Sequence, residues 1–164
     1  MSNSRTRRAR KLRLVDSQIE DELVNRALRV GFATKNQQHV DQHFGSCASI
    51  AIYLVMPHET HLHEVVAFET ANQDGNEDKL AVRIEALEGC AALYCQAIGA
   101  SAIAQLKKKG VQPLKVTPNM PITAQLQQLR HELRESPAFW MLHALEAEKD
   151  ASRFDDMEAE GWVE

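Results

Sequence analysis

Three short apolar runs in the first half of the chain restrict what it can fold into. They occupy residues 27–34, 49–56 and 61–68. Each run has the length of a strand, and the second is rich in β-branched side chains, which is typical of buried strands. Turn residues 57–60 separate the second run from the third, so these two strands are expected to form a hairpin. A chain with this pattern must build a sheet.

The second half of the chain alternates between helix and strand patterns. Leu80, Ile84 and Leu87 recur at helical spacing, and the small apolar run at residues 90–97 is typical of a central strand. The other elements are expected at residues 113–116 for an edge strand, and at 99–109, 121–134 and 136–149 for helices. This order predicts an α/β fold, in which flanking helices cover a mixed five-stranded sheet.

The loops that follow the first and fourth strands are expected to meet. A right-handed crossover places these two strands side by side and parallel. Their carboxyl-terminal loops, residues 39–47 and 96–101, then border one crevice. Ligands of open α/β sheets bind in crevices of this kind. The sequence therefore predicts a binding site between these loops.

The first of these loops, written HVDQHFGSC, holds several groups that can bind metals. A zinc site is disfavoured because His39 and His43 would align only on a helix, and no C-x-x-C pair supplies further ligands. A nucleophile–base pair of Cys47 with a histidine is disfavoured because no oxyanion turn or third orienting group is apparent. Asp41 is expected to shape the turn.

A large, soft ligand fits the two loops better. Imidazole and thiolate groups suit iron and iron–sulfur chemistry, so His43 is a candidate ligand and Cys95, at the end of the fourth strand, lies close to the same crevice. The helix that opens at Gly99 offers free N–H groups to an anion, and metal–sulfur clusters are often anionic. Gly45 and Gly99 would let the backbone approach closely, whereas Cys90 is expected to be a core thiol. From the residues alone, this ligand is one hypothesis among several.

Length and composition favour one soluble domain with flanking segments. The chain has 164 residues, of which 44% are hydrophobic and 26% are charged. No apolar run approaches the roughly 20 residues that cross a bilayer, and three cysteines fit no disulfide framework. We therefore expect a cytoplasmic protein with free thiols and no membrane partner. The expected organisation is a basic arm and lead-in (residues 1–26), an α/β domain (27–135), and a C-terminal helix with an acidic tail (136–164).

Charge is unevenly distributed along the chain. Residues 1–13 carry six Lys or Arg and no acid, whereas the rest carry 13 basic and 23 acidic residues, so their net charge is −10. A basic arm can contact nucleic acid or an acidic partner. The body has no basic face and few aromatics to stack on bases, so we expect a solubilising tail and no nucleic-acid partner.

Longer stretches of the sequence resemble one family. They are RVGFAT, the nearby DQHFGS, and NEDKLAVRIEALEGCAALYCQAIGASAIAQLKKKGVQPLKV. In order and content they resemble the NifX-type carrier proteins of nitrogenase cofactor biosynthesis. These carriers belong to the wider dinitrogenase iron–molybdenum-cofactor-binding family, with NafY, NifY and VnfX. The resemblance covers about residues 28–135.

The resemblance implies a ribonuclease-H-like fold without catalytic carboxylates, and a carrier that is not an enzyme. Its cargo would be the iron–sulfur precursor made by NifB (the NifB cofactor) or the iron–molybdenum cofactor, bound transiently. Its partners would be NifB, the NifEN scaffold and apo-dinitrogenase. The histidine of the HFG motif, His43 here, would be the ligand to the metal. No other ligand is carried over from the family. The positions of the two loops extend the expected binding set to His43, His39, Phe44, Gly45, Ser46, Cys47, Cys95 and Gly99.

Other functions stay open. A NafY- or NifY-like chaperone would deliver mature cofactor to apo-dinitrogenase, and a regulatory or nucleic-acid-binding module of nitrogen fixation would use the basic arm. An enzyme with this fold would need several carboxylates around two metal ions. Asp41 is the only acid near the expected crevice, so an enzyme is disfavoured.

Overall fold

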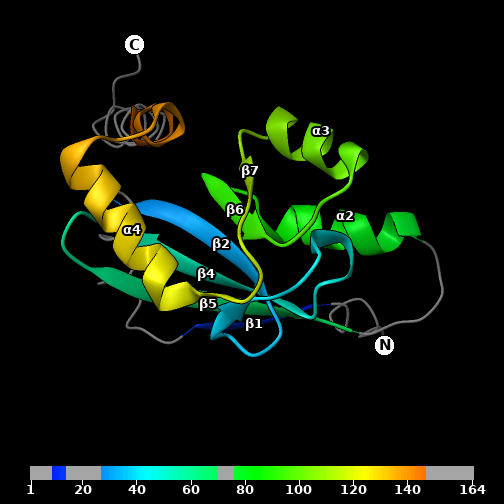
Figure 1. The fold of residues 1–164 in the computed structure, drawn as a ribbon. Helices are drawn as coiled ribbons and strands as arrows, with labels where there is room; N and C mark the ends of the chain where they lie inside the picture. The colour runs from blue at the N-terminus through cyan, green and yellow to red at the C-terminus, as the bar shows by residue number, and fades with distance from the viewer. Residues whose placement is uncertain (1–8, 14–26, 70–75, 147–164) are drawn as a thin grey trace, which may run out of the picture.

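A mixed sheet forms the centre of the protein (Figure 1). The structure, a computed structural model, describes residues 9–13, 27–69 and 76–146. The strands of this sheet follow the order β1-β5-β4-β2-β6-β7. Their bounds are Ala9–Arg13 (β1), Thr60–Phe68 (β5), Ser49–Val55 (β4), Leu28–Thr34 (β2), Ala92–Cys95 (β6) and Gln112–Lys115 (β7).

Strand directions confirm the predicted topology. β4 pairs antiparallel with β2 and with β5, so the predicted hairpin is present. β2 pairs parallel with β6, with Val30 opposite Ala92, so the first and fourth predicted strands do lie side by side. β7 pairs parallel with β6 at the sheet edge, where its proline is tolerated. The α/β class is confirmed, and the ribonuclease-H-like name for it stays a prediction.

β1 is a sixth strand that was not predicted from the sequence. It lies within the basic arm and pairs antiparallel with β5, with Ala9 opposite Phe68 and Arg13 opposite Glu64. The segment is short and basic, so its composition does not favour a strand. It can pair because an edge strand such as β5 presents a row of backbone N–H and C=O groups. The strand β1 therefore forms because the edge of β5 is available for pairing, and not because of its own composition.

Helices cover both faces of the sheet (Figure 1). α2 (Asn76–Ala86) and α3 (Ala100–Lys108) lie on one face, and α4 (Ile122–Glu135) lies on the other with helical residues 139–146. The core is divided in the same way, with Ile84, Leu87 and Leu106 in one cluster and Ile122, Leu126, Leu129 and Met141 in the other. These helices confirm the prediction, and residues 147–149 of the last one lie outside the described part of the chain. None of the helices within the described ranges is long and apolar enough to span a membrane.

The loop after β2 has more structure than the sequence predicts. His39–Val40 form β3, a short strand that pairs with Met120–Pro121 (β8). Phe44–Ser46 form the 3-10 helix η2. The polar composition of the loop indicates only a turn, because the partner of β3 lies far along the chain and leaves no local pattern.

Candidate functional site

The loops after β2 and β6 lie side by side, as predicted. His43 pairs with Ala97 in an isolated parallel bridge. The Phe44 amide donates to the Ala97 carbonyl over 2.9 Å, and the Gln96 amide donates to the Gln42 carbonyl over 2.9 Å. These bonds continue the parallel pairing of β2 and β6 beyond the strand ends, so the two loops form one continuous rim.

A pocket of about 440 Å³ opens at this rim. Its lining consists of His43, Gly45, Ser46, Ala97, Ile98 and Gly99. The volume falls in the usual range of small-molecule sites, about 300–1,000 Å³. The four predicted site residues in this lining are exposed, so a ligand can reach them from solvent.

The other four predicted site residues do not line the pocket. Phe44 is fully buried and anchors η2 in the core. Cys47 and Cys95 are fully buried in the same core cluster. His39 is half-buried in β3, where it lies opposite Pro121. Half of the predicted set therefore surrounds the pocket, and the other half is held in the core or in β3.

Burial keeps the nearby thiols protonated. It raises the pKa of Cys47 to about 11, although the Arg83 guanidinium beside this thiol lowers it. Burial, and then the neighbouring Cys47, raise the pKa of Cys95 to about 11. Metals bind the thiolate form, so neither side chain offers a ready ligand at neutral pH. Cys90 is a core thiol, as predicted, and burial raises its pKa to about 12.

The pocket wall suits a bulky anion. α3 begins beside it, and the N-cap residue Gly99 has no side chain to bond the free N–H groups of the first turn. No acidic residue lies in that turn, so the positive end of the helix is not neutralised there. A Cβ added at Gly45 or Gly99 would meet no atom within 4 Å, so both glycines face open space. These features fit a metal–sulfur cluster that approaches the backbone closely.

Among the described residues that line the pocket, His43 is the one with a metal-binding imidazole. Within residues 27–69 and 79–146, no three His, Cys, Asp or Glu side chains come together as a metal site. Asp41 shapes the turn, as predicted, because its Oδ1 accepts a hydrogen bond from the Lys35 amide over 3.0 Å. A cluster bound to His43 would therefore keep most of its coordination sites free of side chains of the described chain.

Two glutamines that hold the loops were not singled out from the sequence. Gln96 Nε2 donates to the carbonyl of Val40 over 2.8 Å and to that of Thr117 over 2.9 Å. Gln42 Oε1 accepts from the Ala48 amide over 2.9 Å. For Gln96 the sequence did carry a signal, because a polar residue near the end of the apolar run 90–97 needs hydrogen-bond partners for its amide.

Arg83, on α2, was also not singled out. It is buried, and its Nε and Nη2 donate to the Cys47 carbonyl over 3.2 and 2.6 Å. These bonds hold the end of η2 against α2. The sequence carried a weak signal, because Arg83 lies between Leu80 and Ile84 on the helix and so borders its apolar stripe.

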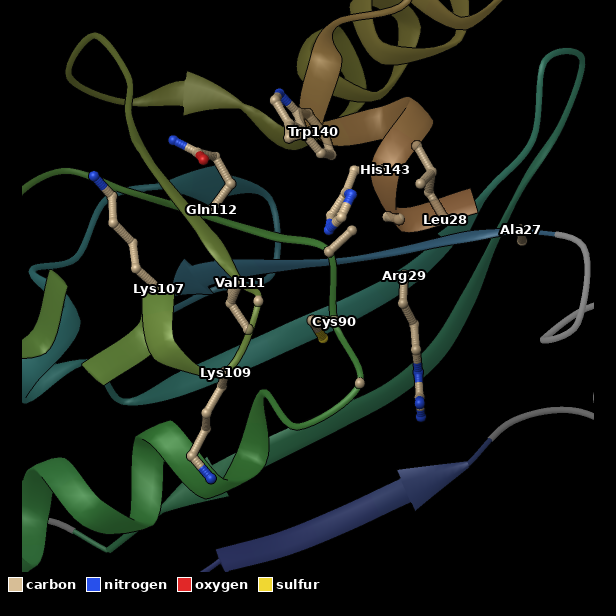
Figure 2. Close-up of a pocket in the computed structure, with 14 residues that line it drawn as sticks. Ala27, Leu28, Arg29, Cys90, Lys107, Lys109, Val111, Gln112, Trp140 and His143 are labelled. Atoms are coloured by element: carbon tan, nitrogen blue, oxygen red, sulfur yellow. The ribbon is translucent and has the colours of Figure 1, made fainter. Parts of the chain in front are cut away.

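A second pocket, of about 550 Å³, lies at the other end of the sheet (Figure 2). The starts of β2 and β6, the end of α3 and helical residues 139–146 border it, and Trp140 and His143 project from that helix (Figure 2). Lys109, in its lining, pairs with Glu88 over 3.7 Å, and Lys107 suits the negative end of α3. Because four residues of the expected binding set line the first pocket and none lines the second, the first pocket is the better candidate site.

Comparison with known proteins identifies the family. The sequence model of the family described as dinitrogenase iron-molybdenum cofactor matches residues 26–132. Protein NifX of Azotobacter vinelandii is 47% identical over 157 residues, which cover 94% of this chain and 97% of that protein. Protein NifX of Herbaspirillum seropedicae is 36% identical over 122 residues, 74% of this chain and 84% of that protein. Protein NifY of Azotobacter vinelandii is 30% identical over 124 residues, which cover 76% of this chain and 50% of that protein.

The fold is shared with a solved structure. The crystal structure of PH0822 matches with a TM-score of 0.50 and 16% sequence identity, over 70% of this chain and 98% of that one. At this identity the likeness concerns the fold alone. The family match spans both loops of the pocket, and it confirms the resemblance found in the sequence. The chain is a NifX-type member of the dinitrogenase iron–molybdenum cofactor family.

Proposed function

We propose that the protein is a non-catalytic carrier, which binds the iron–sulfur precursor of the nitrogenase iron–molybdenum cofactor and transfers it between biosynthetic proteins. Family membership supports a role in the biosynthesis and handling of this cofactor. A stretch of 92 residues is also 34% identical to the FeMo cofactor biosynthesis protein NifB of Frankia alni, over 18% of that protein. In this proposal the partners are NifB, the NifEN scaffold and apo-dinitrogenase, and transfer takes place in the cytoplasm.

The observation that carries the proposal is the exposed position of His43 beside the start of α3. One imidazole can bond one metal of a cluster, and the N–H groups that follow Gly99 can meet its negative charge. Gly45 and Gly99 leave room for a bulky group. A carrier must also release its cargo, so a single protein ligand suits transfer better than full cysteine ligation would.

The other predicted residues support the site in this proposal. Ser46 lines the pocket and can donate a hydrogen bond to the cargo. Phe44, Cys47 and Cys95 pack beneath the rim, and His39 keeps β3 in place beside it. The binding unit is residues 27–135, and the family match over residues 26–132 supports these bounds.

Neither rival function has equal support. No carboxylate of the described chain lines the pocket, whereas hydrolysis on two metal ions needs several, so we propose no catalytic step. A NifY-like chaperone, which would deliver mature cofactor to apo-dinitrogenase, is the second candidate because of the NifY match. The identity to Protein NifX of Azotobacter vinelandii is higher, however, at 47% against 30%, which favours the carrier. The two functions differ in the cluster that should bind more tightly, which is the iron–sulfur precursor for a carrier and the mature cofactor for a NifY-like chaperone.

Titration of the anaerobic protein with isolated NifB cofactor, followed by visible absorption, tests the proposal. We expect His43→Ala to lower the affinity about tenfold or more, while urea unfolding stays unchanged because His43 is exposed. His131→Ala is the matched control, since His131 is an exposed histidine on α4. Equal affinities of these two variants would exclude His43 as the ligand. An unmodified protein that binds neither the precursor nor the mature cofactor would exclude the carrier function.

A further inference from the structure

Arg83 is a buried cation that donates three hydrogen bonds to main-chain carbonyls and lies beside the Cys47 thiol. It is 6% exposed. Nε and Nη2 donate to the Cys47 carbonyl over 3.2 and 2.6 Å, and Nη1 donates to the Lys79 carbonyl over 2.9 Å. Its Cζ lies 4.4 Å from the centroid of the Phe68 ring. Among the described side chains, no carboxylate forms an ion pair with Arg83.

A buried charge of this kind is costly without an opposite charge. Buried ionic groups in proteins are usually paired or bind a ligand, because neutral dipoles recover only part of the lost hydration. Carbonyl groups and an aromatic face provide that partial compensation for Arg83. An anion nearby would compensate the rest of the lost hydration of the guanidinium.

Arg83 is connected to the pocket at His43 and Gly99 through the loop that ends η2. The carbonyl that accepts its two bonds belongs to Cys47, and the preceding residue, Ser46, lines the pocket. The positive end of α3 borders the same pocket near Gly99. Two positive groups therefore border the loops of the pocket: the guanidinium bonded to Cys47, and the start of α3 near Gly99.

We propose that Arg83 is a positioning residue that also sets the charge preference of the pocket, so that the site favours an anionic metal–sulfur cargo. The inference rests on the proposed carrier function and deepens it. The hydrogen bonds to Cys47 hold η2 in place, and the guanidinium charge attracts the anion from behind this loop. Arg83 does not line the pocket, so it acts without touching the cargo.

Two substitutions separate the charge of Arg83 from its hydrogen bonds. Arg83→Lys keeps the charge but cannot present two donors of a planar fork to one carbonyl. Arg83→Met keeps an apolar stem of similar length and removes both the charge and the bonds. Arg130→Met is the matched control, because Arg130 lies on α4, on the other face of the sheet, and donates to the His58 carbonyl over 3.4 Å.

The affinity for tetrathiomolybdate, a compact metal–sulfur dianion, measures the charge preference through its visible absorption. We expect Arg130→Met to bind as the unmodified protein does, Arg83→Lys to stay within about threefold, and Arg83→Met to lose on the order of tenfold. Added KCl should weaken binding to the unmodified protein more steeply than binding to Arg83→Met. The charge preference is overturned if Arg83→Lys is as weak as Arg83→Met, if Arg83→Met binds normally, or if the unmodified protein does not bind the probe. Should Arg83→Met fail to fold, a tenfold loss of affinity in Arg83→Lys would also overturn the charge preference, because this variant keeps the positive charge.

Hydrogen exchange of the amides of residues 44–48 measures the positioning role in the cargo-free protein. We expect faster exchange in both Arg83 variants than in Arg130→Met, and unchanged exchange would overturn that role. The carrier function has its own readout in the binding of NifB cofactor by the unmodified protein and by His43→Ala. If His43→Ala loses that binding and Arg83→Met keeps it, the carrier function stands and the inference about Arg83 fails.

Discussion

The main-chain amide of Phe44 donates to the carbonyl of Ala97 over 2.9 Å, which ties the loop after β2 directly to the loop after β6. The Phe44 side chain is fully buried, so core packing and this hydrogen bond fix the same residue. His43 precedes Phe44 and is exposed. The proposed ligand is therefore accessible to solvent while its backbone is held in a defined position, which a binding site requires.

Gly99→Ser is expected to weaken cargo binding without loss of stability. Gly99 has an ordinary extended geometry, with φ −81°, and an added Cβ meets open space. A serine hydroxyl at this N-cap would accept a hydrogen bond from the first turn of α3, which should raise the free energy of unfolding by a few tenths of a kcal/mol. The same hydroxyl would compete with the cargo for these N–H groups. Urea unfolding and titration with NifB cofactor measure the two effects.

Gly99→Ala is the control for that substitution, because it adds volume to the pocket but no acceptor. We expect it to weaken cargo binding less than Gly99→Ser does. If both variants bind the cluster as tightly as the unmodified protein, the start of α3 does not contact the cargo.

Gln96→Leu is expected to lower the free energy of unfolding by about 1–3 kcal/mol. The substitution removes the donor to the carbonyls of Val40 and Thr117. It therefore removes the hydrogen bonds that join the loop after β6 to β3 and to the segment after β7. Gln105→Leu is the matched control, since Gln105 is exposed on α3 and bonds only the Ser101 hydroxyl, over 3.1 Å. We expect the control to change stability by less than about 0.5 kcal/mol. Equal urea midpoints for the two variants would contradict the role assigned to Gln96.

Stability is expected to fall at alkaline pH. Burial raises the pKa of Cys47 and Cys95 from 9.0 to about 11, and that of Cys90 from 9.0 to about 12. The folded protein thus holds these protons more tightly than the unfolded chain does, so their contribution is complete below pH 9.0 and is lost as the pH rises through about 11–12. Urea unfolding of the unmodified protein and of Cys90→Ala, across this range, measures the effect. We expect a shallower decline in Cys90→Ala, and identical slopes would show that the Cys90 thiol does not contribute.

Local patterns determined most of the fold. The apolar runs at residues 27–34, 49–56 and 61–68 became β2, β4 and β5, because burial with strand periodicity is encoded in neighbouring residues. The handedness of crossovers then predicted that β2 and β6 lie side by side and that their loops meet. These two rules predict the position of the pocket, at His43 and Gly99, without reference to any side-chain contact.

The sequence by itself thus determined the order of the elements and the two loops of the candidate site. Only the tertiary structure decided which residues of those loops face the pocket. It buried Cys47 and Cys95, which the sequence placed in the expected binding set beside the preferred ligand His43. It also placed Arg83 behind the loop, 36 residues along the chain from Cys47, and paired β1 with β5. The physical reason is that burial and hydrogen-bond partners depend on residues distant in sequence, and these leave no local pattern to interpret.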